Sequence, residues 1–117
     1  MKYVLLIYDN HETWANFSDA ERQQLMAEYG TFTQQIRASG HMTGGAQLVE
    51  PSSATSIRLR DGKRLVHDGP FAETREFLGG YYVVEAKDLD EAISIAERVP
   101  SAKIGTIEVR PLVTPPS

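Results

Sequence analysis

The sequence has no cysteine and no long hydrophobic run. The missing thiol excludes disulfide bonds, thiolate nucleophiles and zinc–thiolate centres. The apolar stretch Tyr3 to Tyr8 is too short for a signal peptide with its cleavage site, and far too short to span a bilayer. Acidic residues outnumber basic ones by 16 to 12, which disfavours non-specific nucleic-acid binding and provides no polybasic patch for membranes. We therefore expect a cytoplasmic protein without nucleic-acid or membrane partners.

The 117 residues are predicted to form one domain, because a chain of this length can bury roughly two-thirds of its unfolded surface. Its content of 41% hydrophobic and 24% charged residues is ordinary for a globular protein. We place this single domain at residues 1–112 and a proline-rich C-terminal tail at residues 113–117. Proline is disfavoured in a sheet interior because it cannot donate a ladder hydrogen bond.

The N-terminal region predicts a strand followed by a loop. Tyr3 to Tyr8 is continuously apolar, β-branched and aromatic, which is typical of a strand buried on both faces at the centre of a sheet. Residues 9–17 are mostly polar and predict a loop. Trp14 and Phe17 lie within it, and they could either cover a pocket or cap the core beside the next helix.

A long helix is predicted over residues 19–38. Ser18 followed by Glu21 has the spacing of a capping box at its start, and Gly40 is a suitable C-terminal cap. Apolar residues recur at helical spacing and should form its buried face. These residues are Leu25, Tyr29, Phe32 and Ile36.

The middle of the chain predicts strands and a hairpin. Residues 41–49 form a weak strand region, and residues 55–60 alternate between apolar and polar. Asp61-Gly62 is a strong hairpin signal, so residues 63–67 should return antiparallel. The inward residues of the first hairpin strand would be Ile57 and Leu59.

The C-terminal third predicts strand, helix and strand, over residues 81–86, after Asp88, and over residues 106–110. Asp88 followed by Glu91 has the spacing of an N-cap with a capping box, and the helix should end near Pro100. Its buried face would consist of Leu89, Ala92, Ile93 and Ala96.

This order predicts an α+β, ferredoxin-like βαββαβ domain with an inserted β-hairpin. Two helices can cover only one face of the sheet, yet both faces of the first strand are apolar. We therefore expect a homodimer in which sheet packs against sheet.

The stretch from Asp68 to Gly80 concentrates acids, a base and glycines between strands, where functional side chains tend to gather. Asp68, before Gly69-Pro70, either stabilises the turn or acts as a general base. Glu73 and Glu76 are candidates for proton transfer, and Arg75 is a candidate for binding a carboxylate through its planar fork. The alternative is an exposed cluster of weak ion pairs. Phe71 contacts either the core or a ligand.

Residues outside this stretch complete the candidate site. Arg110 shares the polar face of the last strand with Glu108 and should line a cleft or an interface. Tyr82 or its neighbour should face the cleft, and His41 is a candidate for proton exchange. No two histidines have metal-ligand spacing, and Gly44-Gly45 lacks the context of a phosphate loop, so we expect no metal and no cofactor.

Several of these motifs together resemble the DGPF-domain branch of the YCII-related family: Asp68-Gly69-Pro70-Phe71-Ala72-Glu73, Glu76, Gly79-Gly80-Tyr81-Tyr82 and Val109-Arg110-Pro111. The resemblance extends over nearly the whole chain. It implies a ferredoxin-like fold that dimerises as an α/β barrel, in small bacterial proteins mostly without assigned activity. Members of this branch are often encoded beside extracytoplasmic-function sigma factors, and a few relatives in the wider superfamily act on lactones or chlorinated aromatic breakdown products.

The chain departs from the other YCII branch at the residues that make that branch look enzymatic. Its first predicted helix has no histidine, and Val99-Pro100 replaces an Asp-Pro pair. The dyad suggested for those relatives therefore does not carry over, and any chemistry should come from the loop.

Two functions stay open at this point. The first is a small-molecule-binding dimer with acid–base activity on a small carboxylate or lactone-like substrate, and the second is a non-catalytic accessory protein of an extracytoplasmic-function sigma factor. For the first, we expect Asp68, Glu73, Glu76 and His41 to be catalytic and Arg75, Arg110, Tyr82 and Phe71 to bind the ligand.

Overall fold

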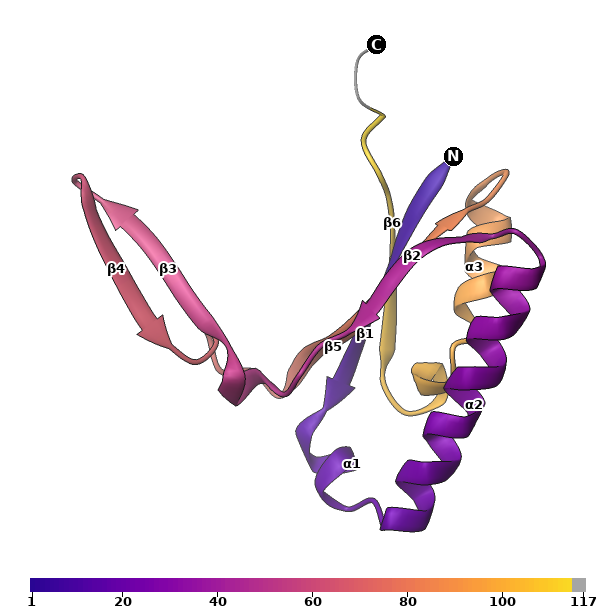
Figure 1. Ribbon diagram of the computed structural model, residues 1–117, viewed down its shortest axis with the longest axis horizontal. Coiled ribbons are helices and arrows are strands. Elements are labelled where there is room, and N and C mark those ends of the chain that lie inside the picture. Colours follow the sequence, from indigo (N-terminus) through magenta and orange to yellow (C-terminus); the bar gives the residue numbers. More distant parts are fainter. Residues whose placement is uncertain (115–117) are drawn as a thin grey trace.

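The computed structural model describes residues 1–114 and has the predicted ferredoxin-like α+β architecture. One antiparallel sheet has the strand order β2-β5-β1-β6, and helices α2 and α3 lie on one of its faces (Figure 1). A second, two-stranded sheet is formed by β3 and β4. The elements are β1 (Lys2–Asn10), α1 (His11–Ala15), α2 (Asp19–Ala38), β2 (Met42–Gln47), η1 (Pro51–Ser53), β3 (Thr55–Arg60), β4 (Lys63–Asp68), β5 (Glu76–Glu85), α3 (Leu89–Ala96), η2 (Pro100–Lys103) and β6 (Thr106–Pro111).

Strand β1 lies between β5 and β6, in agreement with its prediction as a central strand. Its side chains alternate, as in any strand. Tyr3, Leu5 and Ile7 are buried under the helices, while Val4 and Leu6 are half-buried on the opposite, open face of the sheet. This alternation defines the helix-covered face on which the core is built.

Helix α2 has the predicted bounds and the predicted start. The Ser18 hydroxyl accepts a hydrogen bond from the Glu21 amide at 3.1 Å, and the Glu21 carboxylate accepts one from the Ser18 amide at 3.1 Å, which forms the capping box. Gly40 follows the helix with a φ of +80°, a conformation that favours glycine. Three of the four residues predicted for the inner face are buried, and the fourth, Tyr29, packs against the core while half-exposed.

The predicted buried face of α3 is partly wrong. Leu89 and Ile93 are 49% and 39% exposed, whereas Ile95 is buried. The small side chains of Ala92 and Ala96 let the helix approach the sheet closely, and Ile95 lies beside them on the same stripe. The predicted N-cap is present, because the Asp88 carboxylate accepts a hydrogen bond from the Glu91 amide at 2.9 Å.

Two predicted loops are shorter than expected. Strand β1 continues to Asn10, and the region predicted as a loop contains helix α1. The Asn10 side chain caps this helix by accepting hydrogen bonds from the amides of Glu12 and Thr13. Strand β5 begins at Glu76, so the connection from β4 consists only of residues 69–75.

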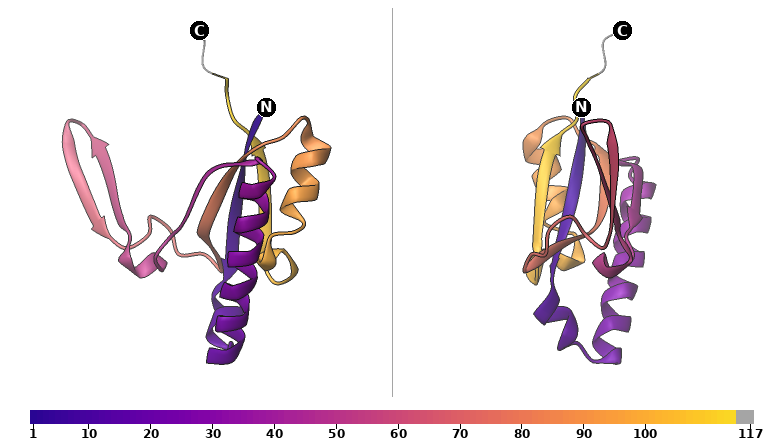
Figure 2. Two further views of the ribbon diagram at one scale, coloured as in Figure 1. Left: turned by 45° about the vertical axis from the view of Figure 1, so that its right-hand side comes forward. Right: turned by 90° about the vertical axis from the view of Figure 1, so that its left-hand side faces the viewer.

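Strands β3 and β4 form an arm (residues 55–68) that projects on the side of the sheet opposite to α2 and α3, as both further views show (Figure 2). The predicted turn is present, since Asp61 and Gly62 both have positive φ, at 52° and 73°. The inward orientation predicted for Ile57 and Leu59 is wrong, because these side chains are 61% and 68% exposed. They extend away from the core of their own chain.

The bend after β4 anchors the base of this arm. Gly69 has a φ of +106°, which favours glycine, and its amide donates a 2.6 Å hydrogen bond to the Ala54 carbonyl. The Ser56 hydroxyl donates to the Gly69 carbonyl at 2.9 Å. The Asp-Gly-Pro motif therefore joins the two ends of the arm.

The C-terminal strand ends at Pro111, on an edge of the sheet where proline is tolerated. Of the tail predicted at 113–117, the last three residues lie outside the described residues. In the described part of the chain, no helix is long and apolar enough to cross a membrane.

We expect Ser18→Ala to lower the free energy of unfolding by about 1 kcal/mol, because it removes the side chain that accepts from the first turn of α2. Urea denaturation would measure the change. Ser52→Ala, in the exposed turn η1, is the control and should stay within about 0.5 kcal/mol of the parent protein. Equal losses in both variants would contradict a specific capping role.

Candidate functional site

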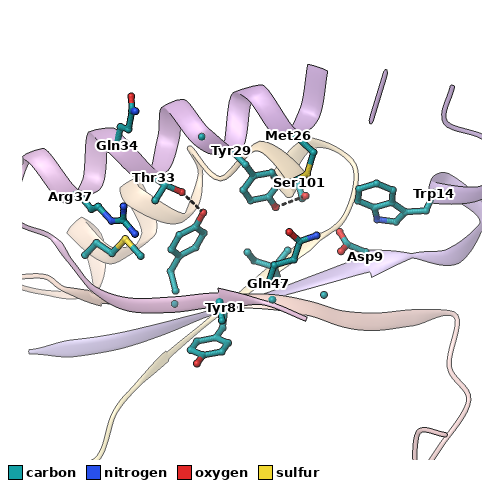
Figure 3. Close-up of a pocket in the computed structure, with 18 residues that line it drawn as sticks. Asp9, Trp14, Met26, Tyr29, Thr33, Gln34, Arg37, Gln47, Tyr81 and Ser101 are labelled. Atoms are coloured by element: carbon teal, nitrogen blue, oxygen red, sulfur yellow. Dashed lines mark hydrogen bonds between the residues drawn. The ribbon is translucent and has the colours of Figure 1, made fainter. Parts of the chain in front are cut away.

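A cavity of about 490 Å³ lies between helix α2 and the helix-covered side of strands β1, β2 and β5 (Figure 3). Its walls combine apolar surface with side-chain hydroxyl, carboxylate, amide and guanidinium groups. The polar or aromatic side chains that line it are Asp9, Trp14, Tyr29, Thr33, Gln34, Arg37, Gln47, Tyr81, Tyr82 and Ser101. Of these, Tyr81 points to the opposite side of the sheet (Figure 3).

Asp9 is the most distinctive group in the cavity. It continues the alternation of Tyr3, Leu5 and Ile7 along β1, which directs its side chain toward the helix-covered face. Asp9 is only 8% exposed, and its Oδ1 atom has no hydrogen-bond partner among residues 1–114. Buried carboxylates are normally paired, so an unsatisfied one suggests a role other than stability.

The environment of Asp9 changes its acidity. Burial raises the pKa of this carboxyl above its ordinary value, because the charged form loses hydration. The side chain of Trp14 acts in the opposite direction and lowers the pKa of this carboxyl. In Figure 3 the Asp9 carboxylate lies between Trp14 and Gln47 at one end of the cavity. Helix α1 therefore contributes directly to the site, through Trp14.

The two glycines of β5 make room for Asp9 and for the neighbouring strand. The pairing of β1 with β5 shifts register here, since Ile7 faces Gly80 while Tyr8 faces Leu78. Gly79 is left as the extra residue of a β-bulge. A Cβ atom on Gly79 would collide with Asp9 Oδ2, and one on Gly80 would lie 3.0 Å from the Ala46 carbonyl oxygen.

Two hydroxyl pairs bridge helix α2 and the floor of the cavity (Figure 3). Tyr29 and Ser101 share a 2.5 Å hydrogen bond, and Thr33 and Tyr82 share one of 2.7 Å. Burial is the main reason that the pKa of Tyr29 is raised to about 12, with smaller contributions from the charge of Asp9 and from Tyr82. Tyr29 therefore keeps its proton at neutral pH and can act as a hydrogen-bond donor.

Exposed residues at the edge of the cavity add a cation and an amide. Arg37, in the last turn of α2, and Gln47, at the end of β2, both line the cavity. The guanidinium group of an arginine is suited to bidentate binding of a carboxylate. Gly30, in the middle of α2, also lines the cavity, and a Cβ atom there would meet nothing within 4 Å. The absence of a side chain at Gly30 therefore keeps this wall open.

Among the residues predicted from the sequence, Tyr82 and Trp14 line the cavity. His41 lies elsewhere, directly before β2. Its Nδ1 atom is 2.7 Å from the Ser39 hydroxyl, and its Nε2 atom is 3.4 Å from Glu91 Oε1. Arg110 is exposed on the open face of the sheet and forms an ion pair with Glu108.

The structure does not bring the loop residues to this cavity. Asp68 pairs with Thr55 at the base of the arm, and Phe71 is 77% exposed. Glu73, Arg75 and Glu76 are exposed as well. None of these residues lines the cavity. The end of the loop nevertheless lies beside the end of β1, because Glu76 pairs with Asn10 and the Arg75 carbonyl accepts a 3.4 Å hydrogen bond from the His11 amide.

Sequence reasoning missed Asp9, Ser101 and Arg37. A signal for Asp9 was available, because an acid two residues after Ile7 has the same parity as the buried side chains of the strand. Because residues 9–17 were predicted as a loop, the alternating pattern of the strand was followed only to Tyr8 and Asp9 was left out of it. Ser101 and Arg37 gave no comparable signal, since their positions depend on how η2 and α2 pack in three dimensions.

These groups can bind a small molecule with carbonyl or hydroxyl substituents and can exchange a proton with it. Asp9 is a proton acceptor or donor, the hydroxyl pairs can hold an oxygen, and Arg37 can hold an anion. Within residues 1–114, no group of three or more histidine, aspartate or glutamate side chains is arranged to hold a metal ion.

The fold and the cavity define a ferredoxin-like domain with a polar pocket between its long helix and its sheet. The family model of the YCII-related domain matches residues 1–114, and the chain belongs to this family. It is 33% identical over 114 residues to an uncharacterised protein, R00369, of Rhizobium meliloti (strain 1021), covering 96% of this chain and 92% of the relative.

A solved structure supports the fold. It is the 5-chloro-2-hydroxyhydroquinone dehydrochlorinase TftG from Burkholderia phenoliruptrix AC1100, in complex with 2,5-dihydroxybenzoquinone. The TM-score is 0.57 at 15% sequence identity, with 97% of this chain and 94% of the other covered. At this identity the likeness shows a shared fold.

We expect Asp9→Asn to stabilise the protein at neutral pH by on the order of 1 kcal/mol, as is common when a functional site is neutralised. The folded pKa of Asp9 is raised, so its stability penalty develops as the pH rises from the unfolded pKa, about 3.9, through the folded value. The advantage of the variant should therefore shrink as the pH is lowered toward 4. Thermal melts across this range would test it, and an advantage independent of pH would contradict the burial of a charged Asp9.

We also expect Gly79→Ala to displace the Asp9 carboxylate, because the new methyl group and Oδ2 cannot occupy the same space. The displaced carboxyl should be better hydrated, so its pKa should move toward the ordinary value; carbon-13 NMR titration of the Asp9 carboxyl would measure this. Gly44→Ala is the matched control, since its Cβ atom would lie at an ordinary 3.9 Å from Val83 Cβ. An unchanged Asp9 titration in Gly79→Ala would refute the proposed contact.

Proposed function

We propose that the cavity binds a small, partly apolar molecule and that Asp9 exchanges a proton with it. The observation that carries this proposal is the buried Asp9 Oδ1 atom, which has no partner within residues 1–114 and lines the cavity. A carboxylate kept in such an environment is destabilising, and a bound ligand that donates a proton or a hydrogen bond would satisfy it.

The roles of the surrounding groups follow from their chemistry. Asp9 takes a proton from a carbon or hydroxyl group next to a carbonyl, and its raised pKa brings it closer to the range where it can return that proton. The hydroxyl of Tyr29, supported by Ser101, donates a hydrogen bond to the oxygen on which negative charge develops. Arg37 holds a carboxylate or another anionic substituent at the cavity entrance.

We infer that the substrate is a single-ring carbonyl compound, such as a lactone, or a small carboxylate. A cavity of about 490 Å³ with an apolar wall and a few polar groups suits one ring with oxygen substituents. The ligand bound to the TftG structure is also a ring with carbonyl and hydroxyl groups, which is consistent with this class.

The sequence-predicted roles of Glu73, Arg75 and Glu76 stay predictions. They provide a direct comparison, because Glu73 is exposed in the loop whereas Asp9 is buried in the cavity. If the cavity is the site, Asp9→Asn should abolish proton transfer and Glu73→Gln should leave it unchanged. If the loop is the site, the two variants should exchange their effects.

We further propose that the protein is a homodimer. Val4 and Leu6, together with Tyr81 and Val83, leave the open face of the sheet apolar and only half-buried. A second sheet packed against this face would complete its burial.

The accessory function with an extracytoplasmic-function sigma factor remains the second proposal. The exposed apolar side chains of the arm are the feature that favours it, because such patches often mark protein contacts. Co-purification of this chain with an extracytoplasmic-function sigma factor would support the accessory function, and a failure to bind would count against it.

The ligand-binding proposal can be tested by a thermal-shift screen with lactones, ring-cleavage acids and other single-ring carbonyl compounds. A compound that raises the melting temperature should lose at least tenfold in affinity in Gly30→Leu, because the leucine side chain would enter the open space beside Gly30. Calorimetric titration would measure the affinity.

Gly30→Ala is the matched control for this variant. It should retain ligand binding and stabilise the helix by about 0.8–1 kcal/mol, since alanine is the better helix former. Ligand affinity that is equal in Gly30→Leu and Gly30→Ala would place the ligand outside the cavity and overturn the proposal.

A further inference from the structure

The arm exposes apolar side chains that its own chain does not cover. Ile57, Leu59 and Val66 are 61%, 68% and 54% exposed, and Ile57 faces Val66 across the two strands. Leu59 lies two residues beyond Ile57, so the three side chains share one face of the arm. The opposite face contains Leu65 with mostly basic neighbours.

The arm is a poor candidate for an independently stable element. It is a separate two-stranded sheet, and in residues 1–114 no strand of the main sheet pairs with it. An isolated two-stranded hairpin is marginally stable in water and normally needs a packed face. A hairpin of this composition is therefore expected to be supported by a surface outside its own domain.

The surface area of the whole molecule indicates how large that support should be. The chain exposes 8199 Å², whereas a compact monomer of 13.0 kDa is expected to expose about 6,300 Å². Its radius of gyration is 16.4 Å, against about 13 Å for a compact domain of this size. The exposed surface area of the chain exceeds that expected for a compact monomer by more than the roughly 800 Å² that each partner buries in a standard interface.

The arm and the open face of the sheet are on the same side of the molecule. Both views show the arm on the side opposite to α2 and α3 (Figures 1 and 2), which is also the side of the half-buried Val4, Leu6, Tyr81 and Val83. A single partner seated on this side would cover both apolar surfaces.

The charges favour a second copy of this chain as that partner. The arm contains four basic and two acidic residues, so the other residues contribute 8 basic and 14 acidic side chains. The basic arm of one copy would therefore be attracted to the acidic body of another, and a two-fold axis would repeat the contact.

We propose that the arm clasps a second copy of this chain, with the face formed by Ile57, Leu59 and Val66 packed against the body of that copy. The inference takes the homodimer proposed above as its starting point and assigns the arm as the segment that holds it together. The Asp-Gly-Pro bend at Gly69 and its bond to Ala54 would fix the direction in which the arm reaches out.

The test is the mass of the intact chain by sedimentation equilibrium. We expect the parent protein to be a dimer and Ile57→Glu/Val66→Glu to dissociate at least tenfold more readily, because the glutamates would bury charge in the contact. Leu65→Glu is the matched control, as an apolar residue of similar exposure (50%) on the other face of the arm, and it should leave the dimer intact.

The outcomes separate this inference from the proposals on which it rests. A monomeric parent protein would overturn both the dimer and the contact made by the arm. In that case the arm either packs on its own sheet or binds a different protein. A dimeric parent with an unaffected double variant would overturn the clasp alone. Ligand affinity, measured separately, tests the cavity independently of either result.

A second measurement covers the case in which the double variant does not fold. Because the chain has no cysteine, Leu59→Cys provides a single thiol for a nitroxide label. Mixed with isotope-labelled, nitroxide-free protein, it should broaden methyl resonances of the body of the other copy, including those of the open face. If the nitroxide-labelled and isotope-labelled proteins are mixed in equal amounts and no methyl resonance is broadened, the proposal is overturned.

Discussion

The burial of one carboxylate at the end of the central strand is the constraint on which the candidate site depends. Asp9 occupies a position of β1 where the alternation demands an apolar side chain, and the surrounding elements adapt to it. Strand β5 omits a side chain and bulges at Gly79, helix α1 supplies Trp14, and α2 keeps its Gly30 wall open. A chain selected only for stability would be expected to place a hydrophobic residue there. The stability lost by burying this carboxylate therefore indicates a functional role for Asp9.

The sequence was sufficient for most of the fold. The apolar run of β1, the capping box at Ser18 and the Asp61-Gly62 turn are local patterns with local causes, and each predicted its element. The prediction was wrong where tertiary packing decides which side chains are buried. On α3, for example, Ile95 is buried and Ile93 is exposed. Burial of the arm was also mispredicted, because Ile57 and Leu59 alternate like core residues yet their own chain offers no core to receive them.

The candidate site was less predictable than the fold, for a physical reason. Asp68, Gly69 and Pro70 attract attention as a motif, yet in the structure Gly69 closes the base of the arm through bonds to Ala54 and Ser56. Tyr82 was identified because a strand tyrosine must face one side or the other, and its side faces the cavity. Groups such as Ser101 become neighbours of Tyr29 only after α2 and η2 pack, and no spacing in the sequence encodes that contact.

The pairing of β1 has a consequence for the order in which the molecule can form. Its residues 2–10 pair with residues 76–85 on one side and 106–111 on the other, so both ladders join segments distant in the sequence. Such non-local contacts slow folding, because long loops must close before any pairing is gained. During synthesis β1 therefore cannot complete its pairing on both sides until residues 106–111 have left the ribosome.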